Sequence, residues 1–541
     1  MNNVKLLDCT LRDGGFVSNW VFGHDTIINI FELLSNSNLD IIEVGYLYDK
    51  CEKDYNKARF PNTKALNETF EKVTVDNGKS MVVAMIDFGD CAINNICDCK
   101  DSFIDGIRVT FKKKNIDEAI EFCKLIKGKG YDVFAQPVSI TTYSDREMID
   151  LIEKINLLNP YAMSIVDTYG LMHKNDLIRY FYLMDNNLNK DVSVGYHSHN
   201  NFQLGYANAI ELLEVQTYRN IILDTSCYGI GKSAGNTCTE LMAMYLNENY
   251  EKKYDIGQIL EIIDIDIMKI YNRNSWGYKI DYFISASNKC HPKYVEFLKN
   301  KNMLSIKSIN EILCMIDDDK RLFFSPEHIE ELYLKYQNNI IDDSKSYEYL
   351  KKKLINKNIL ILGPGKTLLS QKDKIQEYIE RSNPLVISVN CIPNIYKLDY
   401  VFVSNSKRYY QLSNKISNNN EFEVITTSNI SDSNNNIKLN YYSLIPGDKI
   451  HDNSMCMLIN IMINIGIKEI NLAGFDGSTL SSTKNYYDNF LEFDGHDLND
   501  KVDKNKYIKD KISEFRKKIN INFITNSIYD KEEELVCLNI N

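Results

Sequence analysis

The stretch Val4–Gly15, VKLLDCTLRDGG, sets the expected fold, because a short apolar run ends in a polar turn that closes with two glycines. Comparable apolar runs recur over about the first 240 residues, separated by longer amphipathic stretches. This alternation is typical of strand–helix units in a parallel sheet. Eight such units favour a (β/α)8 TIM barrel over a doubly wound sheet. The expected strands are Val4–Cys9, Ile41–Gly45, Met81–Asp87, Gly106–Thr110, Asp132–Pro137, Ala162–Asp167, Ser193–His199 and Asn220–Cys227.

The 541 residues are enough for two to four domains. We assign residues 1–250 to the barrel, and helical periodicity predicts a helical extension over residues 251–350. A lysine-rich stretch, 351–357, then precedes a new series of apolar runs, which predicts a Rossmann-like α/β domain over residues 351–541. Its expected strands are Ile359–Leu362, Leu385–Asn390, Tyr400–Ser404, Glu423–Thr427, Glu469–Ala473 and Asn520–Thr525.

The composition excludes several classes of protein. Hydrophobic residues make up 44% and charged residues 25% of the chain, as in a soluble folded protein. The net charge of −11 argues against nucleic acid as the main partner, because no basic surplus exists to neutralise phosphates. No apolar stretch approaches the roughly 20 residues of a membrane-spanning helix. The 13 cysteines follow no disulfide framework, so we expect a cytoplasmic enzyme.

Polar residues at the ends of the expected strands predict a metal site. Catalytic groups of a TIM barrel lie at the carboxyl ends of its strands. Asp13 follows the first expected strand, while His197 and His199 close the seventh. Histidines at positions i and i+2 of a strand point to the same side, so both can bind one ion. Two imidazoles and one carboxylate would leave coordination positions open for a substrate.

Three segments together carry a resemblance to a known group of enzymes. They are Leu11–Gly14 (LRDG), His197–Asn200 (HSHN) and Gly229–Asn236 (GIGKSAGN). In this order and at these barrel positions they resemble the DRE-TIM metallolyase superfamily, which includes 4-hydroxy-2-oxovalerate aldolases, HMG-CoA lyase and isopropylmalate synthase. The resemblance covers roughly residues 1–340. Within the superfamily the chain looks most like the oxovalerate aldolases and the aldolase-domain proteins of bacterial surface-polysaccharide clusters.

The resemblance implies roles for individual residues. Asp13, His197 and His199 would hold a divalent ion, Mg²⁺ or Mn²⁺, with Asn236 completing its shell. The ion would chelate a 2-oxo acid, and Arg12 would stabilise the enolate oxygen that forms during bond cleavage.

The chain also departs from the family pattern. The oxovalerate aldolases carry a basic histidine after the Arg-Asp-Gly turn, whereas Phe16 stands here. His24, Tyr46 and Tyr282 remain as candidates for the base, with Tyr282 favoured by the resemblance. The acetyl-CoA-dependent synthases carry a glutamate two residues after the metal-binding aspartate, where this chain has Gly15. This difference argues against a Claisen condensation.

Further polar residues within or at the end of expected strands are candidates for the substrate pocket. Glu43, Arg108 and Asp167 belong to the second, fourth and sixth expected strands. Residues at the mouth of a barrel also form structural hydrogen-bonded pairs, so both roles stay open.

The expected C-terminal domain begins with a strand that enters a glycine turn, Ile359–Thr367 (ILILGPGKT). Such a turn at the start of a helix can bind a phosphate. With Ala473–Gly477 it resembles, weakly, nucleotide-binding domains of the pterin pyrophosphokinase and sialyltransferase type. In that interpretation Gly363, Gly365 and Asp476 contact a nucleotide, and His496 is a candidate base.

The favoured hypothesis is a metal-dependent carbon–carbon lyase of the aldolase type, acting on a 2-oxo acid such as pyruvate and an aldehyde, in surface-polysaccharide sugar synthesis. One alternative keeps the fold but transfers an acyl group from acetyl-CoA to a 2-oxo acid. Another makes the protein bifunctional, with a C-terminal module or transferase for nucleotides or nucleotide sugars. We expect a homo-oligomer that binds neither nucleic acid nor a membrane.

Overall fold

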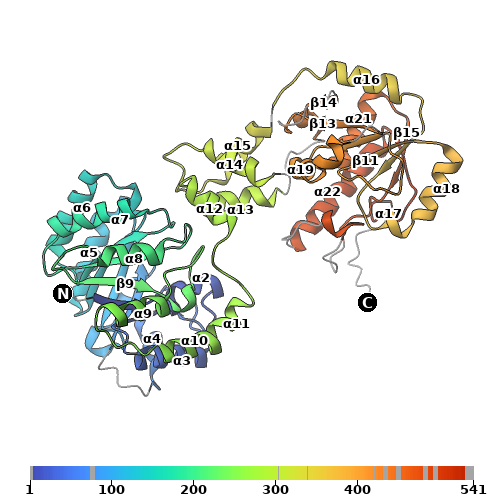
Figure 1. Ribbon diagram of the computed structural model, residues 1–541. Coiled ribbons are helices and arrows are strands. Elements are labelled where there is room, and N and C mark those ends of the chain that lie inside the picture. Colours follow the sequence, from blue (N-terminus) through green and yellow to red (C-terminus); the bar gives the residue numbers. More distant parts are fainter. Residues whose placement is uncertain are drawn as a thin grey trace. The chain divides into compact units, whose positions relative to one another are not determined.

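The computed structural model describes residues 4–73, 80–301, 304–337, 339–418, 421–430, 437–445, 453–478, 485–491 and 498–530. The chain divides into two compact units, Met1–Pro292 and Lys293–Asn541 (Figure 1). The boundary between the units falls within residues 251–350, for which a helical extension was expected. Each unit is described by itself.

The first unit is built around a closed barrel of eight parallel strands, as the sequence predicts. Pairing of β1 with β2, in which Leu7 lies opposite Ile41, closes the ring. The strands are β1 (Val4–Asp8), β2 (Ile41–Leu47), β4 (Met81–Asp87), β5 (Gly106–Phe111), β6 (Asp132–Pro137), β7 (Ala162–Asp167), β8 (Ser193–Ser198) and β9 (Ile221–Thr225).

One short strand was not expected. β3 (Arg59–Phe60) adds to β2 at its carboxyl end, with Tyr46 opposite Arg59. A strand of two residues has no periodicity of its own, so sequence patterns cannot reveal it. It places Arg59 at the same end of the barrel as the polar turns that follow the strands.

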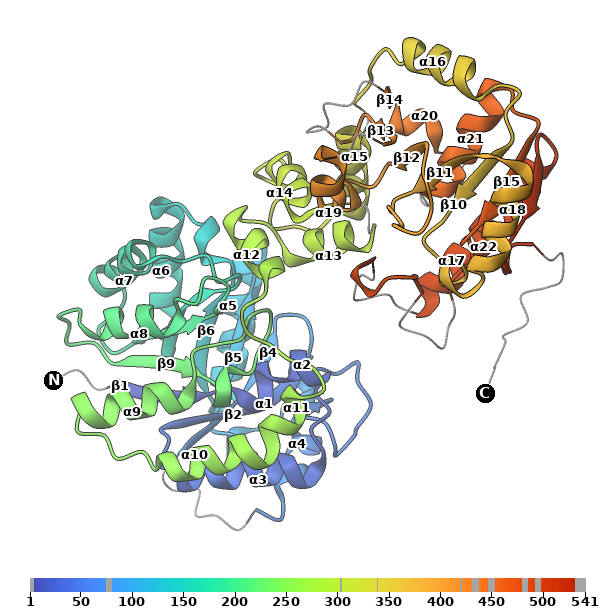
Figure 2. The ribbon, with the colours of Figure 1, turned by 45° about the vertical axis from the view of Figure 1, so that its right-hand side comes forward.

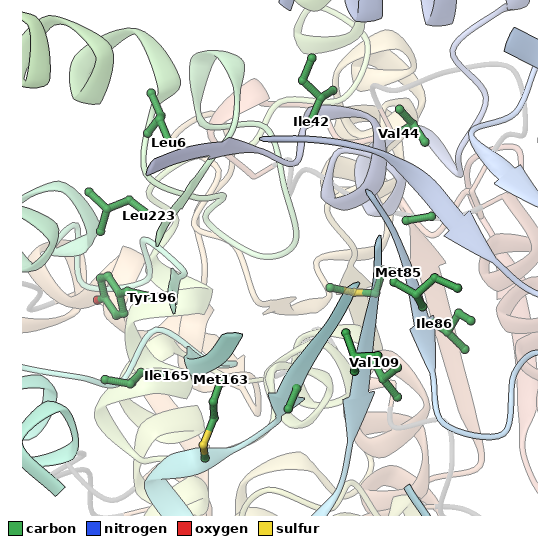
Figure 3. Close-up of a cluster of buried hydrophobic side chains, with 14 of the residues drawn as sticks. Leu6, Ile42, Val44, Met85, Ile86, Val109, Met163, Ile165, Tyr196 and Leu223 are labelled. Carbon is green, nitrogen blue, oxygen red and sulfur yellow. The ribbon is translucent and has the colours of Figure 1, made fainter. Parts of the chain in front are cut away.

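Helices surround the barrel (Figure 2). They include α1 (Thr10–Asp13), α2 (Gly15–Ser18), α3 (His24–Asn36), α4 (Thr63–Phe70), α5 (Ile116–Gly128), α6 (Asp145–Leu158), α7 (Lys174–Asn187), α8 (Gly205–Leu213), α9 (Thr239–Asn249), α10 (Ile256–Ile262) and α11 (Met268–Tyr271). The last helix of the first unit is α12 (Ile280–Ser287). Alternate strand residues pack beneath these helices as one large apolar cluster, part of which is drawn in Figure 3. It includes Leu6, Ile42, Ile165 and Leu223.

The intervening strand residues face the barrel interior, because side chains alternate along a strand. Their apolar members form a smaller buried cluster that includes Leu7, Ile41, Val83 and Ile222. The interior therefore has a small apolar layer, and the same inward positions nearer the carboxyl ends carry charged side chains.

The second unit has a seven-stranded parallel sheet in the order β14-β13-β12-β11-β10-β15-β16. Along the chain, β10 to β14 follow one another toward one edge of the sheet, and β15 and β16 then continue from β10 toward the other edge, so the strand order reverses between β10 and β15. Six of its strands were expected, and the three-residue β14 was not. The strands are β10 (Ile359–Leu362), β11 (Leu385–Val389), β12 (Tyr400–Val403), β13 (Glu423–Thr427), β14 (Ile437–Leu439), β15 (Glu469–Ala473) and β16 (Asn520–Phe523).

Two separate apolar clusters cover this sheet. The helices that supply side chains to one are α16 (Ser344–Leu354), α20 (Tyr441–Leu444), α21 (Ser454–Ile465) and α22 (Leu498–Arg516), and those that supply the other are α17 (Thr367–Ser370), α18 (Lys372–Ser382) and α19 (Ser406–Ser417). The remaining helices are α13 (Pro292–Asn300), α14 (Ile306–Cys314) and α15 (Pro326–Gln337). Among the described residues, no helix combines the length and apolar character needed to span a membrane.

Candidate metal centre

The structure brings Asp13, His197 and His199 together at the carboxyl ends of β1 and β8. One ligand atom from each lies within 4.8 Å of those of the other two. All three side chains are buried. Strand alternation puts both histidines on the inward side of β8, and the helical turn α1 turns Asp13 toward them. One carboxylate and two imidazoles in this arrangement can bind a single divalent cation.

Two orphaned polar atoms show that this group fits a cation. Nδ1 of His199 and Oδ1 of Asn236 are buried and have no hydrogen-bond partner. Buried polar atoms without partners are costly, and a metal ion would satisfy atoms that carry lone pairs. Nδ2 of Asn236 donates to Oδ2 of Asp13 at 2.7 Å, which turns the amide oxygen away from that carboxylate. The ligand atoms that converge are thus one carboxylate and two imidazoles, and Asn236 contacts the same carboxylate through its amide nitrogen.

Charged neighbours fix the position of Asp13. The Arg12 guanidinium pairs with Asp13 through Nη1 and, through Nε, with Oε2 of Glu43 at 2.7 Å. Burial alone would raise the pKa of Asp13, but Arg12 and then the two histidines hold it well below its usual range. Asp13 is therefore ionised and ready to bind a cation. Nη2 of Arg12 is buried without a partner, so it remains available to a substrate oxygen.

The chain of charges continues to another metal candidate, His197. Nη1 of Arg108 lies 2.9 Å from Oε2 of Glu43, and Nη2 of Arg108 pairs with Asp224. Oδ2 of Asp224 lies 3.0 Å from Nδ1 of His197. A carboxylate on one imidazole nitrogen orients the ring and leaves the other nitrogen for a metal. Arg108 lowers the pKa of Asp224 against the effect of burial.

The glycine-rich loop Gly229–Asn236 closes over Asp13. The backbone N–H of Lys232 points at Oδ2 of Asp13 at 3.3 Å. A side chain at Gly231 would collide with both that oxygen and Nδ2 of Asn236. Burial lowers the pKa of His199 to about 3, with a contribution from Lys232. The loop thus holds two of the candidate ligands in place.

The three candidates for the base lie apart in different surroundings. Phe16 lies in α2, with its ring about half exposed beside Trp20. Nε2 of His24 contacts the Thr69 carbonyl oxygen at 3.3 Å. The Tyr46 hydroxyl donates to Asp90 at 2.7 Å, and burial raises its pKa far above its ordinary value. Tyr282 lies half-buried in α12.

Of the three candidates for the substrate pocket, Glu43 and Arg108 belong to the chain of charges. Asp167 occupies the same face of β7 as Ile165, which packs under the helices. Its carboxylate accepts hydrogen bonds from the backbone N–H groups of Leu171 and Met172 at 2.8 and 3.0 Å. Burial raises its pKa to about 6. The structure thus places Asp167 at the end of β7, where its carboxylate binds the loop that follows the strand.

Sequence reasoning missed Asp224, although it lies within an expected strand. The run Ile221–Thr225 alternates, so Asp224 shares the inward face with Ile222. A charged residue on an inward position of an apolar strand was the signal that could have revealed it.

In the second unit the predicted nucleotide contacts come together where the direction of the sheet reverses. The N–H groups of Gly363 and Gly365 donate to Ala473 and Gly474 carbonyl oxygens, both at 2.7 Å. Asp476 accepts hydrogen bonds from both the backbone N–H and the hydroxyl of Thr367. A side chain at Gly365 would collide with Asp476.

These contacts join the loops that follow β10 and β15, so both glycine N–H groups are used within the protein. His496 lies outside the described residues.

Comparison with known proteins gives a family and several relatives. Residues 3–265 match the HMGL-like family model. The chain is 23% identical over 281 residues to a 4-hydroxy-2-oxovalerate aldolase of Geobacillus genomosp. 3, covering 50% of this chain and 81% of the relative. It is 24% identical over 277 residues to an oxaloacetate decarboxylase of Mycobacterium tuberculosis, covering 51% and 79%. Among solved structures, the N-terminal domain of a Bacteroides vulgatus protein aligns with a TM-score of 0.48 and 26% identity, over 57% of this chain and 99% of that one.

Proposed function

Residues 3–265 form a domain of the HMGL-like family, and on that premise we propose that the chain is a divalent-metal-dependent aldolase or lyase. It makes or breaks a carbon–carbon bond next to the enolate of a 2-oxo acid of the pyruvate type, with an aldehyde as the other partner. The observation that carries this proposal is the buried convergence of Asp13, His197 and His199 at the carboxyl end of the barrel.

A Mg²⁺ or Mn²⁺ ion held by Asp13, His197, His199 and Asn236 would polarise the keto and carboxylate oxygens of the 2-oxo acid. Arg12 supports the same chemistry from the protein side. Its Nη2 donor has no partner in the described residues, so it can donate to the oxygen that becomes negative in the enolate. Glu43 fixes this guanidinium by pairing with its Nε.

Cleavage of a 4-hydroxy-2-oxo acid breaks the bond between its third and fourth carbons. The electron pair of that bond stays on the pyruvate fragment as the enolate, and the hydroxyl proton passes to a base as the aldehyde forms. The enolate carbon then takes up a proton to give pyruvate. We propose Tyr282 as the base, because the resemblance to the oxovalerate aldolases favours a tyrosine of this region and Phe16 cannot accept a proton.

The test replaces each histidine of the site in turn. His197→Ala and His199→Ala should abolish Mn²⁺ binding in calorimetry and, with it, deuterium exchange into the pyruvate methyl group. His24→Ala serves as the matched control and should retain metal binding. Methyl exchange that persists in both site variants would contradict the proposal.

Decarboxylation of a 2-oxo diacid is a second candidate reaction. Phe16 stands where a base for a substrate hydroxyl is expected, and decarboxylation requires no such base. The carbon–carboxylate bond breaks, CO₂ leaves, and the electron pair forms the same enolate. Release of CO₂ from oxaloacetate without cleavage of any hydroxy-oxo acid would favour this reaction.

Acyl transfer from acetyl-CoA is the weaker alternative. A side chain at Gly15 would collide with the indole of Trp20, so this turn has no room for a catalytic glutamate. The thiol released from acetyl-CoA can be followed directly. We expect none in the presence of pyruvate and metal.

We propose that the second unit binds a nucleotide or nucleotide sugar, which would link the enzyme to surface-polysaccharide synthesis. Ligands of doubly wound sheets bind where the strand order reverses, and the loops after β10 and β15 meet at that point. A thermal-shift screen of the full chain with nucleoside mono- and diphosphates tests this idea. No stabilisation by any of them would count against it.

We further propose that the enzyme is a cytoplasmic homo-oligomer. All cysteines in the described part of the chain are free, which supports a reducing compartment. Light scattering of the purified protein would give the oligomeric state.

A further inference from the structure

Arg59 lies in a cage of three aromatic rings at the mouth of the barrel. Its guanidinium carbon is 3.8 Å from the ring centre of Tyr48, 4.7 Å from that of Trp20 and 5.7 Å from that of Tyr46. β3 holds the backbone of Arg59 against the carboxyl end of β2. The cation lies over these rings, which cannot accept the in-plane hydrogen bonds of its N–H groups, so those groups are the part that can bind a ligand.

Among the described residues, this guanidinium has no counter-charge. None of the described carboxylates lies within ion-pair distance, and no described oxygen accepts a hydrogen bond from its nitrogens; Nε is also buried. Asp90 lies at the same end of the barrel but accepts the hydroxyl of Tyr46 instead. An arginine stays protonated at any physiological pH, so a partly buried one without an anion is unfavourable. An anionic ligand would supply the missing partner.

The cage adjoins the candidate metal site through Trp20. This residue is 8% exposed and adopts a left-handed backbone conformation, with φ of 59°. Its N–H donates to Gly15 and its carbonyl oxygen accepts from Ala58, the neighbour of Arg59. Its indole lies directly on Gly15, two residues after Asp13, and the indole Nε1 is buried without a partner. One aromatic ring therefore contacts both the metal-site turn and Arg59.

We propose that Arg59 binds a carboxylate or phosphate group on the aldehyde partner, so that the enzyme selects anionic aldehydes. This inference rests on the proposed function. The carboxylate of the 2-oxo acid would be bound at the metal site, which leaves the Arg59 cage to the second substrate. A guanidinium edge binds two oxygens of a carboxylate or phosphate at once. The Tyr48 and Trp20 rings hold the guanidinium in place.

The experiment compares how fast the enzyme adds pyruvate to charged and to neutral aldehydes. Wild-type enzyme loaded with Mn²⁺ should prefer glyceraldehyde 3-phosphate over glyceraldehyde if Arg59 binds a phosphate. It should prefer succinic semialdehyde over butanal if Arg59 binds a carboxylate. In Arg59→Gln the ratio of kcat/KM for the charged to the neutral aldehyde should fall by about 10- to 100-fold, as expected for a hydrogen-bonded charge. Arg59→Lys should restore part of the ratio.

Arg146→Gln, an exposed arginine of α6 that pairs with Asp150, is the matched control and should keep the wild-type ratio. An equal loss for charged and neutral aldehydes in Arg59→Gln, or no preference in the wild type, would overturn the proposal. Calorimetric titration of glyceraldehyde 3-phosphate or succinic semialdehyde, whichever is preferred, provides a readout besides activity, and binding unchanged in Arg59→Gln would also overturn it. Failure of the proposed function is recognised separately, because the wild type would then show no methyl exchange of pyruvate.

Discussion

Arg108 is fully buried between Glu43 and Asp224, so its removal leaves two carboxylates without a counter-charge. Breaking a buried pair from one side costs about 3–5 kcal/mol. Arg108→Met should therefore lower the free energy of unfolding of the first unit by about that amount, measured by urea denaturation.

Arg146→Met removes an exposed arginine and should change stability by less than about 0.5 kcal/mol. Equal stabilities for the two variants would show that the buried pairs contribute nothing.

Asp8 predicts a pH dependence of stability. It is fully buried, and burial raises its pKa to about 6 even though Thr10 and Thr239 donate hydrogen bonds to it. Because the folded pKa lies above the unfolded one, its contribution to stability is fully present below about pH 4 and is lost as pH rises through 6.

Asp8→Asn should remove this dependence. Relative to the wild type, the variant should become more stable by up to about 3 kcal/mol between pH 4 and pH 8. Denaturation at both pH values measures the change, and parallel pH profiles for the two proteins would contradict the assignment. Thr239 can rotate its hydroxyl to meet the new amide, so the variant should fold.

At the level of whole elements, the loop Gly229–Asn236 packs against Asp13 of the candidate metal site. A methyl group at Gly231 would push against Asp13 and Asn236 at once. Gly231→Ala should weaken Mn²⁺ binding by at least about tenfold while the barrel stays folded, because a 1.4 kcal/mol disturbance is enough for that change.

The matched control is Gly128→Ala in α5, where an added methyl group meets no atom. It should leave Mn²⁺ affinity unchanged and stabilise the helix slightly. Calorimetric titration of both variants gives the comparison. Unchanged affinity in Gly231→Ala would show that the loop does not hold the ligands.

Sequence patterns predicted the strands more completely than they predicted the contacts between side chains. All eight barrel strands were found because each alternates between the helix-covered face and the interior over five to seven residues. β3 and β14 escaped because two or three residues show no period. Asp167 and Asp224 lie at or near the ends of similar apolar runs. Asp167 shares the helix-covered face with Ile165, whereas Asp224 shares the inward face with Ile222, and the sequence does not say which face is which.

The candidate ligands could be proposed from His-x-His and its distant aspartate, but their partners could not. Arg59 meets Trp20 and Tyr48 only because β3 adds to β2, and no local pattern encodes that pairing. The same holds for the contact between Asp476 and Thr367, which joins the loops after β15 and β10.

At the scale of the whole molecule, the two units have separate hydrophobic cores. We expect two unfolding transitions in calorimetry, and a fragment of residues 1–292 should reproduce one of them. Mn²⁺ should raise the midpoint of that transition alone, because a ligand stabilises only the unit that binds it. A shift of both transitions, or an unfolded fragment, would show that the units depend on each other.

The buried charges around the metal candidates also constrain how the chain can change over generations. Ion pairs link four buried residues, Arg12, Glu43, Arg108 and Asp224. A single substitution among them leaves the buried charge of a neighbour without its partner. We expect their effects to be strongly non-additive, as double-mutant cycles would measure. We therefore expect related proteins to keep these four residues together or to replace them together.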